Sequence, residues 1–435
     1  EQVQMSDRPT SPATRVLMLQ GPHGPFFRQL AEMLRATGAA VWRVGFNAGD
    51  EAFWRPKGSY IPYRGDEAGW PIFRQSLMED FGITDLVLYG DTRPVHAVAI
   101  AVAEARGLKV HVFEEGYLRP YWVTYERGGS NGHSRLMRMD LGAMRDALSQ
   151  VPGHMPEAPA HWGDMRQHVF YGALYHFRVM AGQRRYPTFR PHRDLSVVAE
   201  FRLYLRRLIL MPLHRIERWI ATRTVRHGGF PYHLVLLQLE HDASFRMHSS
   251  FRSMTEFVEL CLEGFARGAP RHHHLVFKAH PLEDGRAAVA RTVRTTARRL
   301  GLRGRVHFIR GGKLAALLDS AKSAVTVNST SAQQALWRGL PVKAFGRAIF
   351  GKPGLVSGQA LPDFFAAPDL PDVAAYRDFR HFLLETSQVP GGFYSASGRR
   401  QLLRRVVDMM LATDDPYDAL GSGKAAPRQQ FTLVR

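Results

Sequence analysis

The sequence predicts an α/β fold with two doubly wound domains, in which parallel strands alternate with helices. The main observation is that short runs of apolar residues alternate with longer stretches whose apolar residues recur every three or four positions. This alternation occurs twice, before and after a basic stretch of different composition. The length of 435 residues also favours two hydrophobic cores over one.

The first series of elements lies in the N-terminal third of the chain. Its first strand is followed by a Gly/Pro turn at 21–25. We expect strands at 16–19, 41–46, 85–89 and 109–113, with helices at 26–37 and 97–106. Strands that alternate with helices at this spacing form βαβ units and a parallel sheet.

The alternation resumes after Gly228. We expect strands at 233–239, 274–279, 306–309, 323–327 and 341–345, helices at 251–266, 285–300, 313–320 and 331–338, and a final helix at 397–413. The expected regions are an N-terminal Rossmann-like domain at 1–150, a basic helical linker or insertion at 151–230, a second Rossmann-like domain at 231–396, and a C-terminal helix and tail at 397–435. Two such domains that face each other create a cleft at the carboxyl ends of their strands. This outline fits GT-B glycosyltransferases, nucleotide-sugar epimerases and some reductases.

The composition limits the class of protein. A formal charge of +19 predicts attraction to polyanions such as nucleic acid, anionic lipid or an acidic substrate. Because no recognisable nucleic-acid motif accompanies the charge, we expect no nucleic-acid partner. The single cysteine, Cys261, excludes a disulfide scaffold and favours a reducing compartment. The first residues lack a secretory signal pattern and no apolar run reaches about 18 residues, so we expect a cytoplasmic protein without a spanning helix.

Familiar nucleotide-binding loops are absent from the sequence. The loop at 21–25 follows a strand but does not match the dinucleotide fingerprint, and there is no phosphate-binding P-loop. Nicotinamide and nucleoside-triphosphate chemistry are therefore disfavoured, and we expect no cofactor. The loop, with His23, is either an acceptor-binding segment or an ordinary tight turn.

A second candidate segment follows the strand at 274–279. Lys278 and His280 lie where an α/β sheet presents ligand-binding groups, so they are candidates for binding a nucleotide or phosphate. Pro281 keeps the exit of this strand out of helical geometry. The alternative for His280 is a purely structural histidine.

Hydroxyl side chains mark the end of the strand at 323–327. Ser329, Thr330 and Ser331 lie where a helix begins. A helix start with free N–H groups and adjacent hydroxyls suits a phosphate. Plain helix capping is the alternative, and the two roles can coexist.

Two acids follow the first strand of the second domain. Glu240 and Asp242 are two positions apart at a strand end, where a carboxylate can serve as nucleophile or general base. A solvated turn is the alternative. In the first domain, charged residues also follow strands and are candidates for orienting acceptor hydroxyls or anionic groups, unless they form structural ion pairs: Asp91, Arg93, Glu114, Glu115 and Arg119.

A run of three histidines, 272–274, precedes a strand. Adjacent residues of a strand point to opposite faces, and no matching acids flank this run. We therefore expect no metal site.

Together these segments resemble the capsule polysaccharide synthesis and export family, in particular its KpsS-type β-Kdo transferases and the related modules of KpsC. The resemblance extends from residue 17 to about residue 350. Its most specific segments are 17–27, 46–50, 90–94, 114–120, 131–134 and 278–281.

The resemblance implies a retaining transferase that moves 3-deoxy-manno-octulosonic acid (Kdo) from CMP-β-Kdo to a lysophosphatidylglycerol-type lipid. It implies that His280 and Pro281 contact CMP with Lys278 beside them, and that residues 329–331 hold the phosphate. It also implies a carboxylate nucleophile, Asp242 or Glu240. His241 stands where the family pattern has an acid, so the choice between these two stays open.

The implied partners are the CMP-Kdo donor, an anionic lipid acceptor, the inner leaflet of the inner membrane and capsule assembly proteins. Between residues 162 and 226, 13 arginines stand against four acids and are interleaved with aromatic and aliphatic residues. Such a segment suits peripheral docking on a membrane. A solvated helical hairpin between the domains is the alternative.

Two other functions stay open. One is a transferase or epimerase that uses a UDP sugar. The other is a non-catalytic capsule export or scaffold component that binds a polyanion through its charge.

Overall fold

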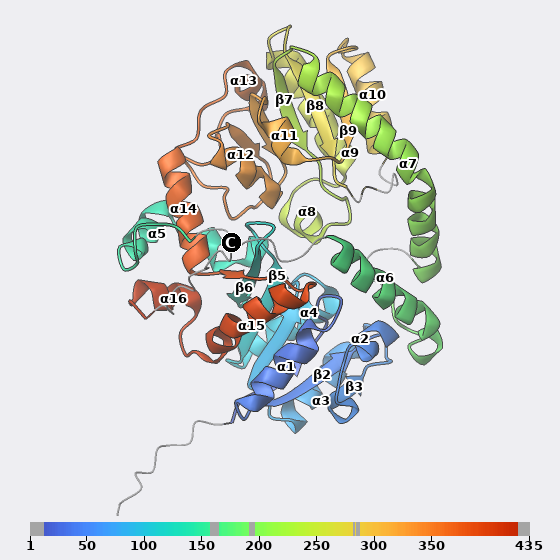
Figure 1. The fold of residues 1–435 in the computed structure, drawn as a ribbon, viewed down its shortest axis with the longest axis vertical. Helices are drawn as coiled ribbons and strands as arrows, with labels where there is room; N and C mark the ends of the chain where they lie inside the picture. The colour runs from blue at the N-terminus through green and yellow to red at the C-terminus, as the bar shows by residue number, and fades with distance from the viewer. Residues whose placement is uncertain (1–12, 157–164, 191–195, 282, 284–287, 425–435) are drawn as a thin grey trace, which may run out of the picture.

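The computed structural model describes residues 13–156, 165–190, 196–281, 283 and 288–424. Within these residues the chain forms a seven-stranded and a five-stranded sheet, each with helices on its faces (Figure 1). The predicted α/β fold with two doubly wound domains is therefore confirmed.

The first sheet has the strand order β12-β6-β5-β4-β1-β2-β3. Five of its strands are parallel: β1 (Arg15–Met18), β2 (Ala40–Gly45), β3 (Tyr60–Pro62), β4 (Asp85–Tyr89) and β5 (Lys109–Glu115). The connecting helices include α1 (Phe26–Ala36), α3 (Trp70–Asp80) and α4 (Pro94–Ala105). β6 (Trp122–Arg127) pairs antiparallel with β5 and was not predicted.

The second sheet has the order β11-β10-β7-β8-β9 and is entirely parallel. Its strands are β7 (Tyr232–Leu236), β8 (His274–Ala279), β9 (Val306–Arg310), β10 (Ser323–Thr326) and β11 (Val342–Ala344). Its helices are α9 (Met254–Gly268), α10 (Val289–Arg299), α11 (Leu314–Leu318), α12 (Gln333–Trp337) and α13 (Leu361–Ala366). Helices on both faces bury the central strands, which is why β7 and β10 read as continuous buried runs.

The end of the chain returns to the first domain. α14 (Val373–Glu385) packs on α5 (Leu141–Leu148), and α16 (Pro416–Gly421) packs there too. Between them, β12 (Gln388–Pro390) forms the edge of the first sheet against β6, and α15 (Ala396–Leu411) packs on α1. The chain has therefore rejoined the first sheet before residue 396, where we expected the second domain to end.

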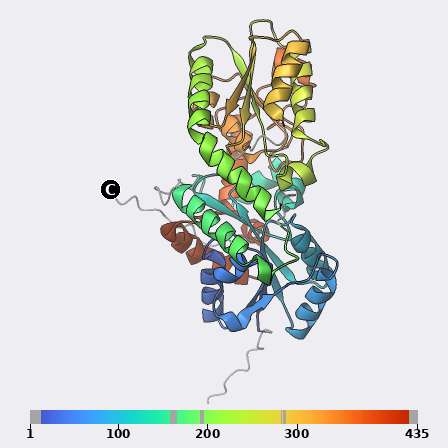
Figure 2. The same cartoon turned by 90° about the vertical axis from the view of Figure 1, so that its right-hand side faces the viewer.

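The basic segment forms two helices, α6 (Met165–Ala181) and α7 (Val197–His227). α6 packs on α2 (Ala48–Ala52) of the first domain, whereas α7 packs along β9 of the second. Pro212 lies inside α7, which is bent in Figure 1. Both helices lie on the side of the molecule that faces the viewer in Figure 2. Among the residues described, no helix is long and apolar enough to span a bilayer.

Side chains of the second domain bind main-chain carbonyls of the first. Buried Lys352 donates from Nζ to the carbonyls of Leu136 at 2.7 Å and Met139 at 2.6 Å. Gln333 Nε2 donates to the Tyr117 carbonyl at 3.2 Å. One hydrophobic cluster also includes buried residues of both domains, so the two sheets share part of their core.

We predict that Leu402→Ala destabilises the protein by about 2–5 kcal/mol, because this fully buried side chain of α15 contributes to the core around α1. Urea unfolding would measure the change. Leu411→Ala, at a 37% exposed position of the same helix, is the control and should change the free energy by less than about 0.5 kcal/mol. Equal effects of the two substitutions would contradict the assignment of α15 to this core.

Candidate active site

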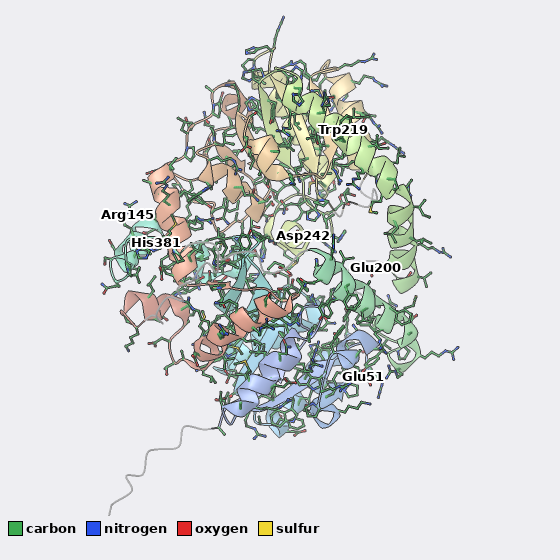
Figure 3. All side chains as sticks on the ribbon, in the orientation of Figure 1. Glu51, Arg145, Glu200, Trp219, Asp242 and His381 are labelled. Carbon is green, nitrogen blue, oxygen red and sulfur yellow. The ribbon has the colours of Figure 1, made fainter. Side chains whose placement is uncertain are left out.

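The predicted site residues follow neighbouring strands at the carboxyl edges of the two sheets. In the second domain they follow β10, β7 and β8, and in the first domain they follow β5, β4 and β1. A short helix after β7, α8 (Ala243–His248), lies between the two sheets (Figure 3). The figure labels Asp242 at the start of this helix. The fold thus brings the two predicted groups to the two sides of one junction.

The last residues of β8 and the loop after it present a basic group and the predicted His-Pro pair at this edge. Lys278 is 9% exposed, and burial, followed by the nearby Arg218, lowers the pKa of its ammonium group. Half-buried His280 accepts a hydrogen bond on its carbonyl from Glu283 N at 3.0 Å, and Pro281 is exposed.

Arg218 reaches this edge from α7 and was not predicted as a site residue. A Cβ atom at Gly311, just after β9, would lie 3.5 Å from Pro281 Cα and 3.8 Å from Arg218 Nη1. A Cβ atom at Gly312 would lie 3.5 Å from Arg218 Cδ. Two cations, Lys278 and Arg218, therefore flank the predicted nucleotide loop. The sequence marks Arg218 only as one arginine of the basic segment.

A pair of amides joins the loops after β7 and β10. Gln238 Nε2 donates to Asn328 Oδ1 at 2.8 Å, and Asn328 N donates back to Gln238 Oε1 at 3.1 Å. Asn328 Nδ2 also donates to the Ser244 carbonyl at 2.7 Å. These buried bonds hold the start of α8 against the loop that carries the predicted phosphate-binding hydroxyls.

Those hydroxyls occupy the beginning of a helical segment. Ser329 caps a 3₁₀ turn (Thr330–Ala332) by accepting a hydrogen bond from Ser331 N at 3.3 Å, and its Oγ lies 2.7 Å from Ser331 Oγ. Thr330 is half-buried. The capping role is present in the structure, whereas phosphate binding stays a prediction.

The two candidate nucleophiles are held differently. Glu240 Oε1 accepts a hydrogen bond from Met254 N at 3.0 Å, at the start of α9. Asp242 caps α8, and its Oδ1 accepts from Ser244 N at 3.1 Å. Glu240 is thus directed to a helix that packs on the sheet, whereas Asp242 begins the helix between the domains.

On the first-domain side, Asp91 and Arg93 have structural partners. Buried Asp91 accepts hydrogen bonds on Oδ2 from Ser130 N and from His133 Nδ1, both at 3.0 Å. Arg93 Nη1 donates to Gln20 Oε1 at 3.3 Å. These contacts tie the loop after β4 to the segment 130–133 and to the end of β1.

The two acids that end β5 differ in their surroundings. Glu115 Oε1 accepts from Tyr89 OH at 3.0 Å and from Tyr394 OH at 2.9 Å. Glu114 accepts from Glu115 N at 3.0 Å, and burial raises the pKa of its carboxyl group to about 7. Such a group can exchange a proton near neutral pH. Arg119 is exposed and donates to the carbonyl of Gly116 in its own turn.

The loop with His23 packs against α6, the first helix of the basic segment. The His23 ring lies 4.3 Å from that of Tyr175 on α6, measured between centroids. A Cβ atom at Gly24, where φ is +102°, would lie 3.1 Å from Tyr171 of the same helix. α6 therefore covers the loop that we expected to bind the acceptor.

Two histidines that were not predicted as site residues meet where the domains join. The rings of His133, in a 3₁₀ turn (Asn131–His133), and His248 of α8 lie 4.7 Å apart at 86°. A Cβ atom at Gly132 would lie 2.3 Å from His248 Nδ1, so this contact requires glycine. Burial lowers the pKa of His248 to about 4, which keeps it neutral. Arg347 Nη2 also donates to the Gly132 carbonyl at 2.7 Å.

The histidine run at 272–274 packs within the second domain. His273 Nδ1 lies 3.0 Å from His233 Nε2, and His274 Nδ1 lies 2.9 Å from His307 Nε2. Across the described part of the chain, no group of three or more His, Cys, Asp or Glu side chains could hold a metal ion.

Two doubly wound sheets with their carboxyl edges at a common junction, and a C-terminal segment that returns to the first sheet, define the GT-B class of architecture. The chain belongs to the capsule polysaccharide biosynthesis protein family, whose profile matches residues 84–394.

Individual relatives cover most of the chain. The capsule polysaccharide export protein KpsS of Escherichia coli is 30% identical over 385 residues, which are 87% of this chain and 97% of that protein. The capsule polysaccharide modification protein LipB of Neisseria meningitidis serogroup B is 31% identical over 391 residues, 88% of this chain and 92% of that protein. Among solved structures, the β-Kdo 2,7 transferase of Thermosulfurimonas dismutans KpsC is similar with a TM-score of 0.42 and 12% identity, over 91% of this chain and 99% of that one.

We predict that Glu114 makes stability depend on pH. In the folded protein the Glu114 carboxyl keeps its proton up to about pH 7. In the unfolded chain the same carboxyl has the ordinary pKa of 4.5 and has already released the proton at that pH. Because the folded state binds more protons in this window, the free energy of unfolding falls as pH rises from about 4.5 to about 7. Glu114→Gln removes this contribution.

Urea unfolding at about pH 5 and about pH 8 would measure the effect. The variant should gain stability relative to the wild type at the higher pH. Glu79→Gln is the control, because a hydrogen bond from Arg106 lowers the pKa of that carboxyl and its titration lies below the window. A wild type and Glu114→Gln variant with parallel pH dependence would contradict the prediction.

Proposed function

We propose that the protein is a retaining glycosyltransferase that moves Kdo from CMP-β-Kdo to a lysophosphatidylglycerol-type lipid during synthesis of the capsular polysaccharide linker. The observation that carries this proposal is the position of Asp242, in the loop after β7 and at the start of the helix between the two sheets (Figure 3). Membership of the capsule biosynthesis family supports the substrate class.

In the first step, a carboxylate oxygen of Asp242 forms a bond to the anomeric carbon of Kdo, while the bond from that carbon to the CMP phosphate oxygen breaks. In the second step, an acceptor hydroxyl oxygen bonds to the same carbon and releases the carboxylate. Two inversions give net retention. The hydroxyl proton passes to a general base.

The donor side of the proposal uses the segment after β8. Lys278 and Arg218 supply positive charge beside His280 and Pro281, and Ser329, Thr330 and Ser331 supply hydroxyls from the neighbouring strand end. Positive charge and hydrogen-bond donors favour the departing phosphate of CMP.

The acceptor side uses the segments after β4 and β5 of the first domain. Glu114, with a pKa of about 7, is suited to receive the proton of the acceptor hydroxyl. Arg93 and Arg119 supply cations for an anionic headgroup, and His23 lies at the boundary with α6.

We predict that Asp242→Asn lowers transfer by at least about 10³-fold, because an amide caps a helix as a carboxylate does but is not a nucleophile. Mass spectrometry of Kdo addition to lysophosphatidylglycerol would measure turnover. Glu240→Gln, which keeps the acceptor for Met254 N, should lose less than about tenfold. Asp372→Asn, at the cap of α14, is the matched control and should be near wild type. Near-normal turnover of Asp242→Asn would disprove the assignment, and a wild type that never forms product would favour a non-catalytic export component.

We also predict that CMP stabilises the protein more than UDP does. A ligand at 100 times its Kd adds about 2.7 kcal/mol to the free energy of unfolding, which a thermal-shift measurement detects. Lys278→Met should reduce the shift with CMP, while Lys424→Met, at an exposed position near the C-terminus, should not. Preferential stabilisation by UDP would indicate a UDP-sugar enzyme instead.

A further inference from the structure

The two helices of the basic segment carry most of the exposed large apolar side chains among the described residues. On α7, Leu205, Ile209, Ile216, Trp219 and Ile220 are between 46% and 69% exposed. On α6, Phe170 and Phe177 are 61% and 57% exposed. The surfaces of monomeric soluble proteins rarely expose so large an apolar area in one place, and such patches mark sites of interaction.

The apolar residues of α7 form one stripe that faces away from the protein. Residues 198, 205, 209, 216 and 220 are spaced by seven and four positions, which places them on one side of a helix. The opposite side holds Arg218, beside Gly312, and Val225, which is buried in the shared core. The helix therefore packs on the second domain through one face and presents apolar side chains on the other. Among the described elements, none covers this outer face in Figure 2.

The same face is strongly basic. Arg202, Arg206, Arg215 and Arg223 of α7 are exposed along the stripe. α7 contains only two acids, and one of them, Glu217, forms an ion pair with Arg310 at 3.3 Å. α6 contains no acid. A second copy of this chain would bring like charges together here, whereas an anionic lipid surface offers both negative headgroups and an apolar layer.

The surface adjoins both sides of the candidate site. α6 contacts the loop of His23 through Tyr175, and α7 reaches the loop of Pro281 through Arg218. We propose that the exposed faces of α6 and α7 form a docking surface for a bilayer rich in anionic phospholipid, from which the acceptor enters the junction between the sheets. The choice of a lipid as the molecule that enters rests on the proposed function.

The test is binding of the full chain to vesicles. The variant Ile209→Ser/Ile216→Ser/Ile220→Ser replaces three apolar side chains of the stripe with polar ones. Because all three positions are exposed, the fold should be retained, as circular dichroism and urea unfolding can verify. The matched control is Ile72→Ser/Leu370→Ser, at positions 74% and 79% exposed elsewhere on the molecule. Co-sedimentation with vesicles that contain phosphatidylglycerol should weaken by at least about tenfold in the triple variant and stay unchanged in the control. Vesicles of phosphatidylcholine alone should bind the wild type weakly.

Trp219 provides a second, local measurement. Its fluorescence emission should move to shorter wavelength on vesicle binding, and Trp219→Phe should lose that part of the change while binding is retained. Equal binding of the triple variant and the wild type would overturn the proposal. So would a wild-type dimer in light scattering that the triple variant abolishes, because the face would then be covered by a second copy.

The outcomes separate docking from catalysis. If the wild type binds anionic vesicles but never transfers Kdo, the docking surface stands and the proposed function fails. If it transfers Kdo to a short-chain, water-soluble acceptor but binds no vesicle, the docking surface fails alone. If both hold, the triple variant should keep turnover on the water-soluble acceptor and lose it on acceptor embedded in vesicles.

Discussion

The relative placement of the two sheets depends on hydrogen bonds from side chains of the second domain to main-chain carbonyls of the first. Gln333, Arg347 and Lys352 donate to carbonyls of Tyr117, Gly132, and Leu136 and Met139. Burial lowers the pKa of Lys352, so the two carbonyls it binds compensate for a buried ammonium group. A carbonyl acceptor is present whatever side chain the first domain carries. This junction therefore constrains the backbone path of the segment 117–139 more than it constrains the identity of the side chains there. The exception is Gly132, where His248 leaves no room for a side chain.

Because the junction fixes the two carboxyl edges opposite each other, candidate residues far apart in sequence lie on the two sides of one junction. The Gln238–Asn328 pair has the same effect within the second domain, where it holds α8 against the end of β10. Asp242 is thus placed by its own cap of α8 together with contacts made by its neighbours. Under the proposed mechanism, the rigidity of these surroundings matters, since a nucleophile must be held within about 0.5 Å of its productive position.

Most of the fold could be predicted from the sequence because its parallel strands are buried on both faces and read as apolar runs, as at Asp85–Tyr89 and His274–Ala279. The elements that were missed include β6, the helices α3 and α14, and two very short strands. β3 and β12 have three residues each, and their pairing with distant strands carries no local pattern. The candidate site was predictable to the extent that strand ends mark it. The part played by Arg218 was not, because it depends on how α7 lies against β9, and the meeting of His133 with His248 depends on the junction between domains.

The return of the chain to the first sheet has a consequence for biosynthesis. α1 and β6 of the first domain are completed by α15 and β12, which are translated after the whole second domain. While the chain emerges from the ribosome, the N-terminal sheet lacks its edge strand β12. The apolar surface of α1 also stays exposed until α15 has been synthesised. The second domain has all the strands of its own sheet at that stage. The domain that begins the protein is therefore completed only after the second domain has been made, and its apolar surface is prone to aggregation until then.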